Sequence, residues 1–520
     1  MRFIKIEGFL ESKRNEHLFL FTACIAALIY RGWPLMKSVA GGVPEFSHVS
    51  YDGVYYVQIA RNIVSGDGLG WEAMLFPVLQ PILIACASVV TGIENYQFLS
   101  VLVSLAASIG MMVPLYLLAR ELAGKKAAAA AVLFVITYPH LNSIALGDTT
   151  ESLYTSLLVL SLYCAFKGGE LFSLGWLFAT GLSFGVTYLA RPEGQIVFGP
   201  VLLILCGRFY QGGKKSLVPK VVAIMVAGFL IAALPYMVFL TKSYGRFVAS
   251  PKLAYESIAM RGKVYQEPFS MTEIDGITAK GNLAWMENGG AGKVLEYVKG
   301  HPAKFTRIYL ENLWSEMPWN VRNSSHLQGY PPVYPIYLWG FATLGGIMLV
   351  MSRGQAWKAL LIWVPFLNLF VYPVFTAGFW IYHVPYVPSL VVFATAFLAY
   401  ASWKIKEVTG KAVPLLMICV LLWTLYSLHT VKSSKPLSVK VISEKTTLAN
   451  EAYKAGQWSR RNLGTDRACM MEWSRLVYYV GGRWVYMPAA VPEQCVEYAK
   501  NHGAQFIIEE LAGQRFFEGS

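Results

Sequence analysis

The chain has 520 residues, of which 55% are hydrophobic and 14% are charged, and its mean hydropathy is +0.45. These values exclude an ordinary soluble protein and indicate a polytopic membrane protein. We attribute the formal net charge of +13 mainly to basic cytoplasmic loops, with a remainder for anionic lipid, and nothing in the sequence indicates nucleic-acid binding.

Long, nearly uncharged runs recur along most of the chain, and each is long enough to cross a hydrocarbon core of roughly 30 Å. Because the runs are continuous, helices are expected in preference to a barrel. Eleven spans are predicted, at residues 17–35, 98–119, 127–146, 152–166, 171–190, 195–207, 221–240, 333–352, 359–376, 385–402 and 412–430. With this set, the basic clusters between spans lie in the cytoplasm, so the N-terminus is expected inside and the C-terminus outside.

One apolar stretch, residues 75–90, does not fit as a span. It carries Pro77 and Pro81 near its start, and no basic cluster follows it. Counting it as a span would move Lys125 and Lys126 to the outside, against the usual charge bias. It is therefore predicted to be a helix that lies in the membrane interface or re-enters it.

Three segments remain outside the membrane on this topology, at residues 36–97, 241–332 and 431–520. The first two are loops of a membrane domain that covers residues 1–430. In the third, amphipathic helical stretches alternate with short apolar runs, which predicts a small extracytoplasmic α/β domain at 431–520. The helical stretches are 449–463 and 492–502, and the apolar runs are 469–473, 484–487 and 506–508.

Two of the seven cysteines, Cys469 and Cys495, belong to this C-terminal domain. In an oxidising compartment they are able to form a disulfide, and two separate thiols are the alternative. The other five lie in apolar segments, where a cysteine usually serves as a small buried hydrophobe.

Acidic residues gather at the outer ends of the predicted spans. Asp52 follows the first span and precedes Tyr55, Ile59 and Ile63, which repeat at helical spacing. It is either a helix N-cap or a functional carboxylate. At the outer end of the third span, Asp148 and Glu151 are three residues apart, so one helical turn is able to present both carboxylates. The alternative is again a helix start.

Two further polar motifs lie at the same face. Arg191, after the fifth span, has a planar fork suited to a lipid phosphate. The alternatives are an ion pair with Glu193 or an anchor that reaches to the interface. Tyr382 and His383 precede the tenth span, and His383 is able to donate to an anion, although a lone histidine is more often structural.

Together these motifs resemble the GT-C fold glycosyltransferases that use polyprenyl-phosphate sugars, the superfamily of protein O-mannosyltransferases and the lipid A aminoarabinose transferase. The matching pieces, in the family's order, are Asp52 to Asn62, Phe76-Pro77 with Pro81, Thr150 to Tyr154, Arg191 to Gly194, and Tyr382 with Pro385 and Pro388. Two positions depart from the family pattern: Gly53 stands where an acidic residue is frequent, and Ile381 stands where an arginine is frequent.

The resemblance implies an inverting transfer from a polyprenyl-monophosphate sugar. Such a donor carries its own leaving group, so the reaction needs a base for the acceptor hydroxyl and cations for the departing phosphate. Asp52 is the expected base, and Glu151 with Asp148 is expected to orient the acceptor or hold a metal. The residues expected to bind the donor phosphate are Arg191, His383, Tyr382 and Lys242.

Tyr55 and Tyr56 are expected to line the sugar pocket, with a role as interfacial anchors as the alternative. No cofactor is required by this chemistry. A divalent metal ion held by Asp52, Asp148, Glu151 and His383 stays an open alternative, because scattered hard-cation ligands have no recognisable spacing.

The expected partners are the lipid-linked donor, the bilayer and an extracytoplasmic acceptor, which is lipid A, another surface glycan, a glycolipid or a protein hydroxyl. The expected location is the inner membrane of a bacterium, with the active site and the C-terminal domain in the periplasm. A flippase for lipid-linked sugar is a second hypothesis, but its usual internal repeats and mid-span charges are not found. A scaffold for envelope assembly is a third, and it would leave the outer cluster of charges unexplained.

Overall fold

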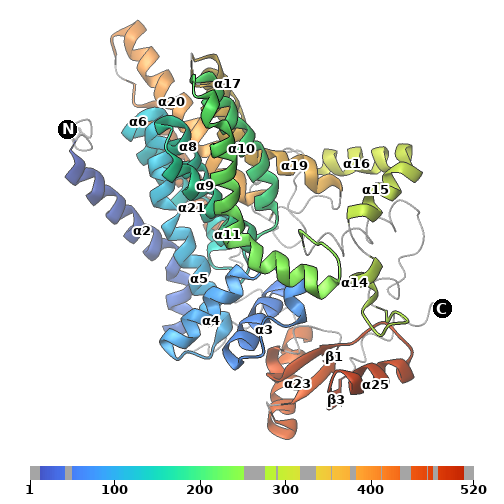
Figure 1. Cartoon of the computed structure of the whole chain (residues 1–520). Coiled ribbons are helices and arrows are strands. Elements are labelled where there is room, and N and C mark those ends of the chain that lie inside the picture. Colours follow the sequence, from blue (N-terminus) through green and yellow to red (C-terminus); the bar gives the residue numbers. More distant parts are fainter. Residues whose placement is uncertain are drawn as a thin grey trace.

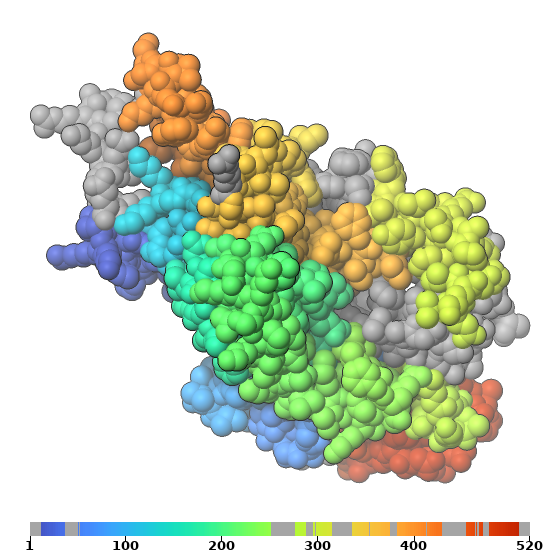
Figure 2. Space-filling model, turned by 45° about the horizontal axis from the view of Figure 1, so that its top comes forward, coloured from blue at the N-terminus to red at the C-terminus, as the bar shows by residue number. Residues whose placement is uncertain are grey.

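The computed structural model describes residues 12–40, 50–250, 276–288, 291–316, 335–352, 354–374, 382–411, 413–433, 447–464, 467–471 and 478–508. Long helices form a bundle, and a small domain with a sheet lies at one end of it, beside α3 (Tyr51–Ser65) (Figure 1). Helix α4 (Leu79–Thr91) packs on α3 from the other side. The space-filling view shows the same neighbourhood, with the C-terminal domain next to the early helices at one end of the molecule (Figure 2).

The described part of each predicted span is largely helical, which confirms a helical membrane fold. The bundle helices are α2 (Lys13–Ala40), α5 (Tyr96–Gly110), α6 (Met112–Ile136), α7 (Pro139–Ala145), α8 (Glu151–Leu171), α9 (Leu174–Ala190), α10 (Glu193–Gln211), α11 (Val218–Tyr244), α17 (Ile336–Met351), α18 (Ala356–Trp363), α20 (Val387–Thr409) and α21 (Leu415–Ser433). Five described segments are long and apolar enough to cross a membrane on their own, Lys13–Met36, Tyr96–Ile136, Lys215–Tyr244, Ala356–Val374 and Val384–Thr409. Shorter apolar helices include Leu174–Ala190, Ile336–Met351 and Leu415–Leu428.

The backbone is irregular at one point between two predicted spans and along another predicted span. Gly124 interrupts α6 with φ 83° and ψ 174°, a conformation that glycine adopts most readily, so the helix ends and restarts between the predicted second and third spans. The predicted span 359–376 continues beyond α18 as η4 (Val364–Leu367), α19 (Asn368–Val371) and η5 (Tyr372–Val374). Pro365 and Pro373 lie in these short turns, where a missing backbone N–H prevents a regular helix.

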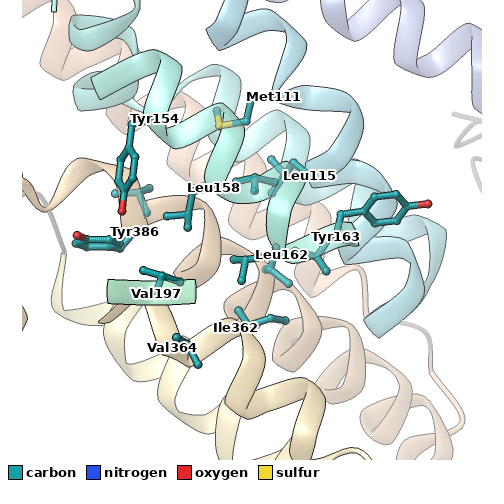
Figure 3. Close-up of a cluster of buried hydrophobic side chains, with 14 of the residues drawn as sticks. Met111, Leu115, Tyr154, Leu158, Leu162, Tyr163, Val197, Ile362, Val364 and Tyr386 are labelled. Carbon is teal, nitrogen blue, oxygen red and sulfur yellow. The ribbon is translucent and has the colours of Figure 1, made fainter. Parts of the chain in front are cut away.

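Close helix packing builds the core of the bundle. Gly181 and Gly185 of α9 face the backbone of α11 at Met225 and Phe229, where an added methyl group would overlap the opposite main chain. Small residues are the usual means by which membrane helices approach one another. Figure 3 shows the apolar filling between the helices, in which Leu158, Leu162, Val197 and Ile362 point toward one another.

The predicted interfacial helix is α4, and a short turn, η1 (Trp71–Met74), connects it to α3. Two tyrosines of α11 fix this connection. The Tyr236 hydroxyl donates to the carbonyl oxygens of Ala73 (2.8 Å) and Phe76 (3.1 Å), and the Tyr244 hydroxyl donates to that of Met74 (2.7 Å). The bundle therefore holds the η1 backbone directly.

The C-terminal domain is an α/β unit, as predicted. Three parallel strands, β1 (Ala468–Met471), β2 (Arg483–Tyr486) and β3 (Phe506–Ile507), lie in the order β2-β1-β3. The helices of the domain are α23 (Thr447–Leu463) and α25 (Pro492–Asn501). The remaining elements are η2 (Lys215–Leu217), η7 (Val384–Tyr386), α14 (Ala284–Asn288), α15 (Ala291–Gly300) and α16 (Pro302–Glu316).

The disulfide considered for Cys469 and Cys495 is not formed. The Cys495 thiol instead donates to the carbonyl oxygens of Pro488 (3.4 Å) and Ala490 (3.5 Å). Neighbouring residues of a strand point to opposite faces of a sheet. Cys469 of β1 packs with Tyr55 and Trp484 on one face, whereas Cys495 of α25 packs with Met470 on the other. The sheet itself therefore separates the two sulfur atoms, and the alternative of two thiols holds.

Candidate active site

The start of α3 and the loop before α8 meet at one end of the bundle. Ser50 caps α3: its hydroxyl accepts from the Gly53 N–H (2.9 Å), and its own N–H donates to Oδ2 of Asp148 (2.8 Å). Asp52 lies in the first turn of α3 and is not the N-cap. The structure thus places Asp52 and Asp148, far apart in the sequence, in the same neighbourhood.

Gly53 makes this approach possible. A methyl group at this position would overlap the Asp148 carboxylate. The acidic residue that the family pattern leads one to expect after Asp52 is absent, and a second carboxylate reaches the start of α3 from the 147–151 loop. This approach cannot be read from spacing, because the two segments meet only in the folded chain.

The 147–151 loop is fastened to α5 by a set of buried hydroxyl groups. Ser100 donates to the carbonyl oxygen of Asp148 (3.1 Å), and Ser104 donates to that of Thr149 (3.3 Å). Gln80 of α4 donates to both serine hydroxyls, at 3.1 and 3.2 Å. Burial raises the pKa of Asp148, and the charge of Asp52 raises it further against the lowering effect of the Ser50 hydrogen bonds.

Arg191 stands at the C-cap of α9 between two carboxylates. Its Nη1 lies 2.5 Å from Oε1 of Glu151, and its Nη2 lies 3.0 Å from Oε1 of Glu193. The three side chains are only 3%, 5% and 10% exposed, respectively. The guanidinium also lies over the ring of Tyr382, 5.0 Å from its centroid. The Arg191–Glu193 pair considered from the sequence is therefore present, with Glu151 as a third member.

Tyr56 joins the two groups of charges. Its ring is buried, its side chain is hydrogen-bonded to Thr150, and the charges of Asp52, Glu151 and Arg191 all act on it. Burial, with the two carboxylates, raises its pKa, so the phenol stays neutral. We call the group formed by Asp52, Tyr56, Asp148, Glu151, Arg191 and Glu193 the outer acidic cluster.

The other predicted site residues lie in different surroundings. His383 is fully buried next to Tyr382, and Lys242 is exposed in the last turn of α11. Tyr55 is buried in an aromatic group that reaches the C-terminal domain. Its ring stacks on Phe76, 4.2 Å between centroids, and lies tilted against Trp484 at 5.1 Å. Tyr55 thus lies between the bundle and the C-terminal domain. Within the described residues, no group of three or more His, Cys, Asp or Glu side chains is arranged to hold a metal ion.

Two features of the site were not predicted from the sequence: the tyrosine pair Tyr372 and Tyr386, and the buried Glu72. The Tyr372 hydroxyl donates to Oε1 of Glu193 (3.5 Å) and lies 3.1 Å from the Tyr386 hydroxyl, so two tyrosines from the irregular ninth span and from η7 support the cluster. Glu72 of η1 is 1% exposed and accepts from Asn62 of α3 at 3.3 Å. Burial raises the pKa of Glu72 to about 8. The sequence signal for the first feature is the density of tyrosines at 372–386, and Glu72 has no comparable signal.

Residues 77–239 match the family of dolichyl-phosphate-mannose-protein mannosyltransferases. The apo oligosaccharyltransferase of Archaeoglobus fulgidus superimposes with a TM-score of 0.57 and 13% identity, over 96% of this chain and 70% of that chain. ArnT from Cupriavidus metallidurans, bound to undecaprenyl phosphate, gives a TM-score of 0.54 and 14% identity, over 97% and 90%. The chain has the GT-C fold. No curated protein sequence matches it.

The GT-C fold confirms the architecture expected from the sequence, and it extends through the C-terminal domain, because the superpositions cover nearly the whole chain. The family match at 77–239 includes Asp148, Glu151, Arg191 and Glu193 of the outer acidic cluster and ends before the C-terminal domain. The part of the chain that carries most of the cluster is thus the part with a recognisable family sequence.

Proposed function

We propose that this protein is an inverting membrane glycosyltransferase that moves a sugar from a polyprenyl-monophosphate donor to a hydroxyl of an extracytoplasmic acceptor. The observation that carries the proposal is the outer acidic cluster, in which side chains from α3, the 147–151 loop, α8, α9 and α10 meet at one end of the bundle. The mannosyltransferase family match supports it. So do the fold matches to ArnT with undecaprenyl phosphate and to the archaeal AglB with a dolichol phosphate and a peptide.

In the proposed reaction, the acceptor oxygen attacks the anomeric carbon and the bond from that carbon to the phosphate oxygen breaks. Asp52 takes the acceptor proton, and the phosphate leaves with the electron pair of the broken bond. A partly exposed side chain in the first turn of α3 suits Asp52 to meet an acceptor from the outer side. The Asp148 carboxylate accepts a hydrogen bond from the Ser50 N–H, so it positions the start of the helix that carries the base.

Arg191 has two tasks in this proposal. Its Nη1 and Nη2 orient Glu151 and Glu193, and its buried Nε has no hydrogen-bond partner among the described residues. That N–H is available to a donor phosphate oxygen, next to Tyr382. Oε2 of Glu151 is likewise without a partner in the described part of the chain and is able to accept from a sugar or acceptor hydroxyl. His383 and Lys242 stay proposed helpers for the phosphate.

The acceptor class stays within the proposal as lipid A, another surface glycan, a glycolipid or a protein hydroxyl. A bacterial inner membrane, with the outer acidic cluster and the C-terminal domain facing the periplasm, is the proposed location. In that orientation the cluster meets the acceptor on the side where envelope glycans are finished, and the donor phosphate arrives from the membrane.

The test is transfer by the purified protein from a panel of radiolabelled polyprenyl-phosphate sugars, with membrane extract as the acceptor source. One labelled donor should yield labelled acceptor, which would also identify the sugar. Donor binding without transfer for every member of the panel would contradict the proposal and favour a flippase.

A further inference from the structure

Helix α3 is held between two parts of the molecule. On one side, Tyr56 and Ala60 pack with Ile84, Ala85 and Leu99 of α4 and α5. On the other side, Tyr55 packs against the C-terminal domain. Tyr55 and Tyr56 are neighbours on α3, about 100° apart around the helix axis. Tyr56 lies near the charges of the outer acidic cluster, and Tyr55 lies against the sheet.

Several aromatic rings in mutual contact make up the contact on the sheet side. Trp484 of β2 lies 5.1 Å from Tyr55 and 5.0 Å from Trp71, between ring centroids, and Trp71 lies 5.7 Å from Tyr486. Phe76 stacks on Tyr55 at 4.2 Å. Aromatic pairs at such separations prefer defined tilts, which makes them sensitive to orientation as well as to burial.

Trp484 is itself fixed in place. Its side chain is 2% exposed, and its indole N–H donates to the carbonyl oxygen of Met471 in β1 at 2.9 Å. Because a hydrogen bond to the neighbouring strand fixes the indole, Trp484 presents Tyr55 with a ring in a defined position. The η1 backbone beneath this contact is fastened to α11 by Tyr236 and Tyr244.

A second contact between α3 and the C-terminal domain lies six residues further along the helix, at Arg61. The Arg61 guanidinium lies over the ring of Tyr478 from the C-terminal domain, 5.2 Å from its centroid, and over Tyr96 of α5, 5.7 Å from its centroid. The C-terminal domain therefore touches α3 at Tyr55 and at Arg61, along the helix that begins with Asp52.

From these contacts we infer that Trp484 is a positioning residue for transfer: by holding Tyr55, the C-terminal domain sets the placement of α3 and hence of Asp52 against Asp148 and Glu151. The inference rests on the proposed function. It also reassigns Tyr55 from the sugar pocket to this contact. A misplacement of about 1 Å in a reacting group is able to cost on the order of 100-fold in rate.

The experiment compares Trp484→Ala with Trp458→Ala, a tryptophan of the same domain that is 60% exposed on α23. Trp484→Ala should lower kcat for transfer by roughly 10- to 100-fold and change the KM for the donor by less than about twofold. Trp484→Phe should restore most of the rate, and Trp458→Ala should match the wild type. Equal rates in Trp484→Ala and Trp458→Ala, or a loss confined to KM, would overturn the inference.

A double-mutant cycle separates positioning from a direct role of Tyr55. If Tyr55 acts through Trp484, Tyr55→Ala with Trp484→Ala should be no slower than the slower single variant. Multiplying losses, or a change of sugar preference in Tyr55→Ala, would contradict the inference and return Tyr55 to the sugar pocket.

Hydrogen exchange tests the contact without any assay of transfer. The amides of Val54 to Ala60 should exchange faster in Trp484→Ala than in Trp458→Ala, and unchanged exchange would refute the positioning contact. If the wild-type protein transfers no sugar, the proposed function fails, and the exchange data alone decide the role of Trp484.

Discussion

The Arg191 ion triad gives the sharpest prediction for stability. Arg191→Ala removes the partner of two buried carboxylates, Glu151 and Glu193. Breaking a buried ion pair from one side costs about 3–5 kcal/mol, because the remaining charge is left unpaired. Glu193→Gln keeps an oxygen that accepts from Arg191 and leaves the bond to Glu151 intact, so it should cost only about 1 kcal/mol.

The assay heats the purified protein in one detergent and measures the fraction that stays monodisperse at each temperature. The temperature at which half of this fraction is lost is the thermal midpoint. From the most to the least stable, the expected order is wild type, Glu193→Gln, Arg191→Lys and Arg191→Ala. Neutralising all three members, with Arg191→Met, Glu151→Gln and Glu193→Gln together, should recover much of the stability but not the transfer activity. Equal midpoints for Arg191→Ala and Glu193→Gln would refute the account of Arg191 as the shared partner of both carboxylates.

Two other substitutions test the surroundings of the cluster. Gly53→Ala should displace the Asp148 carboxylate and abolish most transfer, at a stability cost of about 1–3 kcal/mol. The control Gly199→Ala, which adds a methyl group in open space on α10, should leave transfer and stability unchanged. Normal activity in Gly53→Ala would contradict the close approach of Asp148 to Gly53. Glu72 has a folded-state pKa of about 8, above the unfolded value of about 4.3. Its contribution to stability is therefore complete below about pH 4.3 and declines as the pH rises through about 8. Glu72→Gln should remove this decline in thermal-midpoint measurements from pH 5 to 9, and identical slopes in both proteins would show that Glu72 is not buried as a neutral acid.

Hydropathy and the distribution of basic residues were sufficient to place the helices of the membrane domain, because the bilayer demands long apolar helices whatever their neighbours. Alternating patterns likewise predicted the strands and helices of the C-terminal domain. The break at Gly124 and the turns around Pro365 and Pro373 modify the spans locally, since single glycine and proline residues act on the backbone without changing the hydropathy.

The site could be predicted only in part. Asp52, Asp148, Glu151 and Arg191 were recognisable as polar residues next to the predicted spans, and the structure brings them into one cluster. The contact of Tyr55 with Trp484, more than 400 residues away in the sequence, left no local pattern. Tyr372 was missed for the same reason, because its hydrogen bond to Glu193 depends on how α10 packs against the irregular ninth span.

The central claim is that Asp52 is the base of a sugar transfer. The most direct measurement is transfer and donor binding by Asp52→Asn on one preparation, beside Asp67→Asn, which changes an exposed aspartate in the loop after α3. Asp52→Asn should lose at least 100-fold in transfer and still bind the lipid donor, while Asp67→Asn should equal the wild type. Transfer at the wild-type rate by Asp52→Asn would contradict the account.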